Sequence, residues 1–142
     1  MEPCGLCDPA IGPEVARSTH WRAILNKNQN LLGKTMLVAQ RHVERVPDLR
    51  PEEWTDRLIQ LRRVVTGISA LLQPDHFNYS FLQNQDRHVH LHVHPRYARK
   101  RTYANSTFVD ADFPYSITPA FEQRILPEEA MRRLAALLRD NG

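Results

Sequence analysis

The sequence has no long apolar run, no internal repeat and no strong excess of charge of either sign. No stretch approaches the roughly 18 continuous apolar residues of a membrane span, so we expect no transmembrane helix. The N-terminus, MEPCGLCDPAIGPE, lacks both the basic and the apolar region of a signal peptide, which predicts a cytoplasmic protein. The formal net charge of +3 favours phosphate-bearing ligands but is too small to indicate binding to duplex nucleic acid.

Cysteine is also scarce: the chain has only two, and they form a single C-x-x-C at Cys4 and Cys7. In a cytoplasmic protein such a pair indicates metal binding or redox chemistry more than a structural disulfide. The 142 residues contain no linker or low-complexity segment that would divide them, so we expect one domain with a single core.

The clearest predicted element is a long helix. It begins at Pro51, where the missing N–H costs nothing, and ends before Pro74. Its apolar residues recur at spacings of three and four and form one stripe, which we interpret as core packing: Trp54, Leu58, Leu61, Val65, Ile68 and Leu72. A short amphipathic helix is predicted over residues 126–142.

Four strands are predicted, at residues 20–25, 35–40, 77–83 and 87–95. The last two should form an antiparallel hairpin. Residues 96–126 are rich in proline, aromatic and turn residues and are expected to form an ordered loop or an edge strand. Strands grouped around one long helix predict an α+β fold with an antiparallel sheet.

The run RHVHLHVHP, Arg87 to Pro95, places four of the seven histidines at alternate positions. Side chains alternate faces along a strand, so these histidines, about 6.5–7 Å apart, should share one face while Val89, Leu91 and Val93 pack on the core. Three interpretations are open. They are a solvated polar face, a metal site in which H-x-H offers two imidazoles to zinc, and catalysis with imidazole as nucleophile and acid. A solvated face gives little reason to repeat histidine, so we favour the other two.

The same residues resemble the signature of the histidine-triad (HIT) superfamily of nucleotide hydrolases and transferases. The run HVHLHV at residues 88–93 is similar to the H-φ-H-φ-H-φ-φ motif, with His94 a departure at the last φ, and the PRY that follows is also similar. Upstream, LNKNQNLLGKTMLVAQRHVE resembles the family's strand-turn-strand, and the C-x-x-C resembles a bacterial subgroup similar to diadenosine-polyphosphate hydrolases. The resemblance implies one HIT-like domain over residues 1–142, with a core at about residues 4–97 and an extension over 98–142.

The resemblance implies an enzyme that cleaves a nucleotide at its α-phosphate. His90 would attack phosphorus and form a nucleotidyl-histidine, while His92 would contact the α-phosphate oxygens and assist the leaving group. Water would then release a nucleoside monophosphate from a dinucleoside polyphosphate or a nucleoside phosphoramidate, with adenine as the expected base. Asn26 stands where the family binds the ribose hydroxyls, although an Asn there also suits the entry to a turn. QNQDR replaces the family's phosphate-contacting Gly-Gln-Ser/Thr, so phosphate contacts are expected from Gln83, Asn84 or Gln85.

The resemblance also implies a structural zinc ion. C-x-x-C supplies two thiolates, and tetrahedral zinc takes four ligands. In the similar bacterial subgroup the other two ligands come from the histidine of RHVE and the first histidine of the triad, here His42 and His88. Zinc on Cys4, Cys7, His42 and His88 would pin the N-terminus to the start of the histidine strand. A redox pair and a frayed tail remain the alternatives for the two cysteines.

Rival functions also follow from these motifs. Within the superfamily, the chain could be a nucleotidyltransferase or a phosphorylase with inorganic phosphate as acceptor. Outside it, the chain could be a non-catalytic zinc- and nucleotide-binding module, or a zinc hydrolase with His88 and His90 as ligands. The resemblance further implies a symmetric homodimer, since a small sheet with one long helix leaves an unpaired edge. Lys34 stands where a His is common in the family, and His94 is either an added phosphate contact or merely a polar residue.

Overall fold

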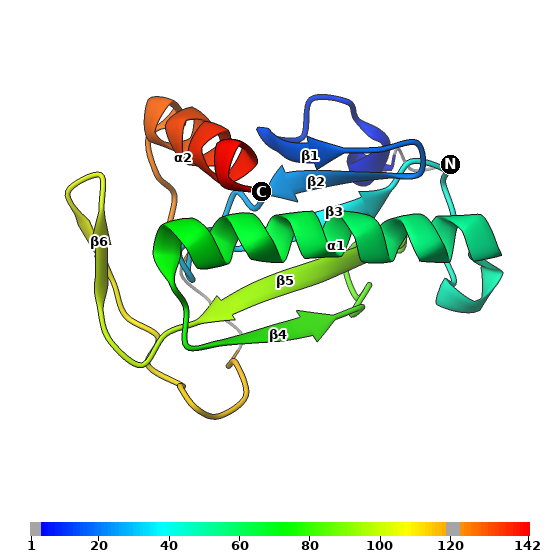
Figure 1. Cartoon of the computed structure of the whole chain (residues 1–142). Helices are drawn as coiled ribbons and strands as arrows, with labels where there is room; N and C mark the ends of the chain where they lie inside the picture. Colours follow the sequence, from blue (N-terminus) through cyan, green and yellow to red (C-terminus); the bar gives the residue numbers. More distant parts are fainter. Residues whose placement is uncertain (1–3, 119–122) are drawn as a thin grey trace.

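The computed structural model describes residues 4–118 and 123–142, and it confirms an α+β fold (Figure 1). Its elements in chain order are β1 (Glu14–Arg17), β2 (Trp21–Leu25), β3 (Thr35–Ala39), α1 (Pro51–Leu72), β4 (His76–Ser80), β5 (His90–Arg96), β6 (Arg101–Tyr103), β7 (Ser106–Phe108) and α2 (Glu128–Asn141), with 3-10 turns at Gly5–Cys7 and Val46–Asp48. Within the described ranges, no helix has both the length and the apolar character that crossing a membrane requires.

Five strands form one sheet in the order β1-β2-β3-β5-β4, and every neighbouring pair is antiparallel. The two helices lie on the same side of this sheet, with α1 in front of its central strands and α2 beside β1 (Figure 1). The core fills the space between the helices and the sheet, and Trp21, Leu37, Ile68 and Leu138 are all fully buried in it. The opposite face of the sheet is therefore left for the functional side chains.

The helices approach each other closely at Gly67. A Cβ atom built there would lie 2.5 Å from the carbonyl oxygen of Leu138, closer than real Cβ atoms come to backbone oxygen. Only glycine fits this crossing, which fixes α2 against α1 and closes the core.

The predicted helix is present, but its apolar stripe is only partly core. Ile68 is buried, whereas 45% of Trp54 and 41% of Leu58 are exposed. The side of α1 that faces the sheet instead includes Gln60 and Val64. The interpretation of the whole stripe as core packing was wrong, because apolar spacing defines a helix face without saying what covers it.

Two further strand pairings were not predicted. The short strand β1 pairs with β2 across a register shift between Glu14 and Ala16. The hairpin of β6 and β7 lies within the segment expected to be a loop or edge strand, and it turns at Ala104 and Asn105, both at positive φ. Strands of three and four residues are too short to show an alternating pattern.

Candidate functional site

Strand β5 builds the polar face of the sheet as its alternating sequence predicts. Val89, Leu91 and Val93 belong to the core on the helix side. Alternation therefore places His90, His92 and His94 on the other side of the strand. The neighbouring strands fix their surroundings, since His92 pairs with Met36 of β3 and Ser80 of β4.

His90 is held in one tautomer by the backbone. Its Nδ1 lies 2.8 Å from the carbonyl oxygen of His88, and its side chain is buried. A carbonyl oxygen can only accept, so Nδ1 carries the hydrogen and donates it. In the neutral ring, the lone pair must then lie on Nε2, which is the state that a nucleophilic histidine requires.

His92 and His94 continue the row of imidazoles. The rings of His90 and His92 meet edge to face at 4.7 Å, and those of His92 and His94 stack at 5.5 Å. Burial, followed by repulsion from His90, His94 and Lys34, lowers the pKa of His92 to about 3. Burial also lowers the pKa of His94 to about 4, with help from Lys34. Both rings are therefore neutral near pH 7, and an anion bound beside them would raise both pKa values again.

A cleft of about 920 Å³ opens over these imidazoles. It brings together both predicted catalytic residues and all the predicted nucleotide contacts: His90, His92, Asn26, Gln83, Asn84 and Gln85. Residues 116–118 and Gln123, from the C-terminal extension, form part of its wall. The cleft is large enough for a small-molecule ligand.

Two of the predicted contacts have distinct local environments. Oδ1 of Asn26 is buried without a hydrogen-bond partner among the described residues, while its backbone N–H donates to the carbonyl oxygen of Lys34 at 2.9 Å. The side-chain amide of Gln83 donates to the carbonyl oxygens of Glu44 and Arg87 at 2.6 and 2.7 Å. Gln83 therefore shapes the loop with its NH₂ group and has only its oxygen left for a ligand.

The sequence-predicted zinc ligands come together in one cluster. The candidate ligand atoms of Cys4, Cys7, His42 and His88 all lie within 4.8 Å of one another. Nδ1 of His88 is 3.3 Å from the sulfur of each cysteine, and Nδ1 of His42 is 3.2 Å from the sulfur of Cys7. Tetrahedral zinc would hold sulfur and nitrogen about 3.5 Å apart, so the donor set fits the ion.

The second ring nitrogen of His88 confirms that its tautomer suits a metal. Nε2–H donates to the carbonyl oxygen of Ala39 at 2.7 Å, which leaves the lone pair on Nδ1 toward the cysteines. Burial lowers the pKa of His88, so the ring stays neutral. A histidine that donates its other N–H to a backbone carbonyl is typical of metal sites.

Arg22 is the part of this cluster that sequence reasoning missed. It is buried, and its Nη2 donates to the carbonyl oxygens of Leu6 and Asp8, both at 2.7 Å. These bonds hold the turn that carries both cysteines against the sheet, which argues against a frayed tail. The available signal was an arginine within the otherwise apolar strand WRAIL.

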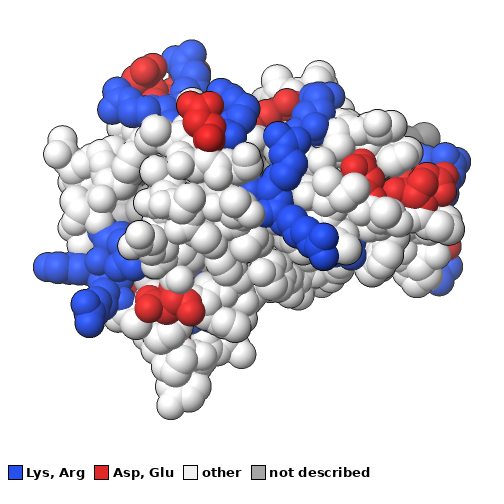
Figure 2. All heavy atoms as spheres, viewed as in Figure 1, with Lys and Arg blue, Asp and Glu red and all other residues white. Residues whose placement is uncertain are grey.

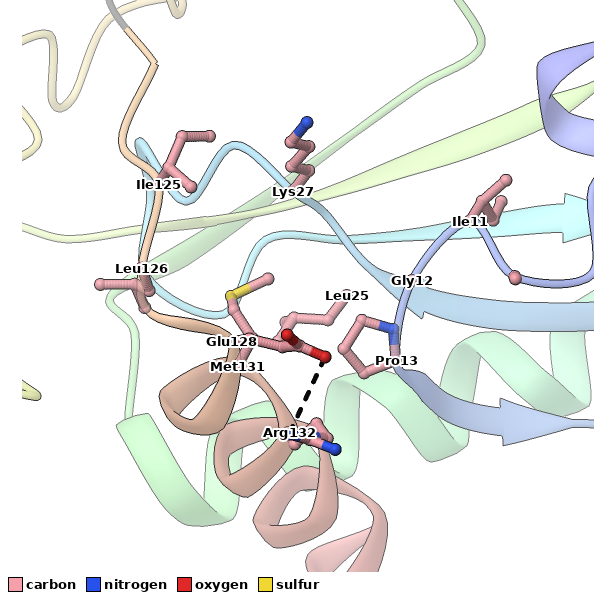
Figure 3. A pocket seen from close by; sticks show the side chains of 11 residues that line it. Ile11, Gly12, Pro13, Leu25, Lys27, Ile125, Leu126, Glu128, Met131 and Arg132 are labelled. Carbon is pink, nitrogen blue, oxygen red and sulfur yellow. Dashed lines mark ion pairs between the residues drawn. The ribbon is translucent and has the colours of Figure 1, made fainter.

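A second cavity of about 550 Å³ adjoins the cleft, and Ile11 and Lys27 line both. Figure 3 shows Met131 of α2 between Leu126 on one side and Leu25 on the other. The ion pair of Glu128 and Arg132, 3.8 Å apart, lies beside it. Residues of the C-terminal extension form one wall of this apolar cavity, which lies next to the cleft that contains the histidines.

The five-stranded antiparallel sheet, the single long helix and the central strand of alternating histidines define the histidine-triad fold. Solved structures with this fold include a histidine-triad protein from Sinorhizobium meliloti, at TM-score 0.75 and 21% identity, covering 92% of this chain and 89% of that one. Another is a zinc-bound histidine-triad family protein from Mycobacterium smegmatis, at TM-score 0.62 and 20% identity, covering 92% and 87%. These likenesses confirm, at the level of the fold, the resemblance that the sequence indicates.

Sequence similarity to known proteins covers a smaller part of the chain than structural similarity does. No protein-family model matches the chain. A curated relative from Schizosaccharomyces pombe, named bis(5′-nucleosyl)-tetraphosphatase (asymmetrical), is 32% identical over 79 residues, which is 52% of this chain. The chain spans only 43% of the length of that relative.

Proposed function

We propose that the protein is a nucleotide hydrolase that cleaves at the α-phosphate through a nucleotidyl-histidine on His90. The observation that carries the proposal is the hydrogen bond from Nδ1 of His90 to the carbonyl oxygen of His88, because it places the lone pair on Nε2 before any substrate binds. The name of the Schizosaccharomyces pombe relative supports a nucleotide substrate of this kind.

The chemistry has two steps. Nε2 of His90 forms a bond to the α-phosphorus, and the bond from phosphorus to the leaving oxygen or nitrogen breaks, so the leaving group departs with its electron pair and takes a proton from protonated His92. Water then adds to phosphorus and gives one proton back to neutral His92, the phosphorus–nitrogen bond breaks, and a nucleoside monophosphate leaves neutral His90. His92, 4.7 Å from His90 between ring centres, contacts the α-phosphate oxygens, and the bound charge raises its pKa toward the range of a proton donor.

The substrates that fit this chemistry are dinucleoside polyphosphates and nucleoside phosphoramidates, with adenine as the expected base. Asn26 binds the ribose hydroxyls, for which its unpartnered Oδ1 is available. The loop residues Gln83, Asn84 and Gln85 contact the phosphates from the rim of the cleft.

Zinc on Cys4, Cys7, His42 and His88 has a structural role in this proposal. With all four positions taken by protein ligands, the ion offers no site to water. Among the described residues, the candidate metal cluster includes His88 but not His90, which disfavours a zinc hydrolase built on these two histidines. When bound, zinc ties the N-terminal turn to the start of β5 and orients His88, whose carbonyl oxygen in turn orients His90.

The protein is further proposed to form a homodimer through α1 and the edge strand β4. Trp54 and Leu58 are exposed on α1, and Trp54 stacks on Phe81 just beyond β4, with ring centres 6.3 Å apart. Figure 2 shows wide uncharged areas on this side of the molecule between the groups of charged side chains. Apolar residues beside an unpaired edge strand are suited to a second copy of the chain.

The decisive experiment incubates the untagged protein with dinucleoside polyphosphates and nucleoside phosphoramidates, with and without inorganic phosphate, and identifies the products. A nucleoside monophosphate in both conditions supports hydrolysis. A nucleoside diphosphate that forms only with added phosphate indicates phosphorolysis instead. Binding of AMP with every substrate left intact at high protein concentration would identify a non-catalytic module.

A further inference from the structure

Lys34 and His94, the two departures from the family pattern, lie side by side on the floor of the cleft. Thr35 of β3 pairs with Val93 of β5, so Lys34, one residue earlier, stands level with His94. On the other side of β5, Asn78 of β4 pairs with His94. All three side chains line the cleft that contains His90 and His92.

Lys34 is a cation without a counter-charge. Its side chain is half-buried, and burial lowers its pKa. Its ammonium donates to Oδ1 of Asn30 at 2.9 Å, and in residues 4–118 and 123–142 no carboxylate oxygen lies within 4 Å of it. A partly buried charge with a neutral partner is incompletely stabilised, and an anion bound beside it would offset that cost.

His94 has hydrogen-bonding capacity to spare. Its Nε2 lies 3.1 Å from the hydroxyl oxygen of Ser80, while its Nδ1 is buried and has no partner among the described residues. If the Ser80 hydroxyl donates to Nε2, the neutral ring carries its hydrogen on Nδ1 as a donor. The neighbouring Arg96 does not compete for a ligand, because its guanidinium is buried against Asp110 and Asn78.

These groups follow the α-phosphate position along the strand. His94 stands two residues beyond His92, roughly 6.5–7 Å along β5. We propose that Lys34 and His94, with Ser80 and Asn30, form a second phosphate subsite that holds a phosphoryl group next to the α-phosphate of a nucleotide. The inference rests on the proposed function, since that function assigns the α-phosphate to His90 and His92.

The second phosphoryl group has two possible sources on a nucleotide. It is either the next phosphate of the 5′ chain or a phosphate on the ribose, because the backbone of Lys34 is hydrogen-bonded to Asn26, the predicted ribose contact. Both sources present negatively charged phosphoryl oxygens to the ammonium of Lys34.

The test is calorimetric binding of AMP, ADP and adenosine 3′,5′-bisphosphate to full-length protein in a His90→Ala background, which removes turnover. Lys34→Met removes the charge, Lys34→Arg keeps it, and Lys100→Met makes the same change of charge at an exposed lysine outside the cleft. We expect the His90→Ala protein to bind either ADP or adenosine 3′,5′-bisphosphate more tightly than AMP. Adding Lys34→Met should reduce that preference by about tenfold to a hundredfold. Lys34→Arg and Lys100→Met should largely retain it.

The outcomes separate the two proposals. A Lys34-dependent preference for ADP identifies the 5′ chain as the source, and one for adenosine 3′,5′-bisphosphate identifies the ribose. Equal affinities of all three ligands, or a preference that Lys34→Met leaves intact, would overturn the subsite even if the parent protein hydrolyses its substrates. Loss of hydrolysis in the product assay with a Lys34-dependent preference retained would overturn only the proposed hydrolase.

His94→Gln, which removes the imidazole two strand positions from His92, should reduce the same preference, and this variant decides the matter if Lys34→Met fails to fold.

Discussion

The proposed chemistry depends most directly on the two ring nitrogens of His90. The backbone fixes the hydrogen on Nδ1, so the reactive position is selected by the fold and does not depend on a neighbouring carboxylate. This arrangement needs only a short stretch of regular strand. Under the proposed mechanism, the carbonyl of His88 would therefore contribute to catalysis although its imidazole is directed to the cysteines.

His90→Ala is expected to lower turnover by at least about a thousandfold, because it removes the atom that bonds to phosphorus. AMP should still bind, since Asn26 and the loop contacts remain. The measurement is single-turnover product formation together with calorimetry. His20→Ala is the matched control, because His20 lies outside the cleft and precedes β2, away from β4. Near-native turnover of His90→Ala would refute the assignment.

The contribution of His92 to kcat should depend on the leaving group of the substrate. Its ring is neutral in the free protein, and its pKa rises only when phosphate binds beside it. We therefore expect His92 to donate a proton only in the complex with substrate. His92→Gln is expected to cost about 10²- to 10⁴-fold in kcat for substrates with poor leaving groups, and much less for good ones. Comparing kcat across a leaving-group series measures this. An equal loss for every leaving group would argue against assistance by His92.

At the scale of elements, local patterns were predictable and non-local neighbours were not. The two faces of β5 followed from alternation alone, and α1 from its spacing and its prolines. The position of Lys34 level with His94 depends on the register of β3 against β5, which pairs residues more than fifty positions apart. The strand β5 also begins later than expected, at His90, and the connection from β4, in which Gln83 takes a positive φ, is longer than the predicted turn.

The N-terminal turn should depend on zinc for its position. Cys4→Ser/Cys7→Ser is expected to lose the metal and to melt at a lower temperature, because the site hardly exists in the unfolded chain and binding therefore stabilises the fold. Elemental analysis of untagged protein and thermal unfolding measure both effects. Measurable residual hydrolysis would separate a structural role from a catalytic one. Equal zinc in the parent and the variant, or none in the parent, would exclude the site.

The C-terminal extension is tied to β5 by a buried ion pair. Arg96 and Asp110 form two hydrogen bonds of 2.7 and 3.1 Å, and both side chains are almost wholly inaccessible. Burial alone would raise the pKa of Asp110, but the bonds from Arg96 and from the backbone N–H of Tyr97 outweigh it and lower the pKa. The segment that walls the cleft is thereby anchored to the strand that carries the histidines.

This pair should make stability depend on pH. Because the pKa of Asp110 is lower in the folded chain, its contribution is present above the unfolded value of about 4 and is lost as the pH falls through the folded value. Asp110→Asn leaves Arg96 unpaired and is expected to cost about 3–5 kcal/mol at pH 7. Urea unfolding at pH 7 and at pH 3.5 should show a smaller pH effect in the variant than in the parent. Glu128→Gln, at an exposed pair, is the control, and an unchanged pH effect in Asp110→Asn would contradict the argument.

At the scale of the whole molecule, the exposed apolar side of α1 is the feature that a single chain leaves unexplained. Residues such as Trp54 and Leu58 continue the helix stripe past the point where the sheet of the same chain covers it. Beside them, β4 ends the sheet with one edge unpaired. A stable interface buries about 800 Å² on each partner, which one helix face and an adjacent strand can supply.

We therefore expect light scattering at micromolar concentration to give twice the mass of the chain. Leu58→Glu places a charge in the proposed interface and should shift the protein toward monomer, with the fold retained by circular dichroism, because burying an unpaired carboxylate is costly. Leu137→Glu makes the same substitution at a leucine exposed on α2, away from β4, and should leave the dimer intact. A compact monomer in the parent protein would refute the dimer. Dissociation by both variants alike would place the interface elsewhere, since only an interface on α1 and β4 makes the assembly sensitive to Leu58 and indifferent to Leu137.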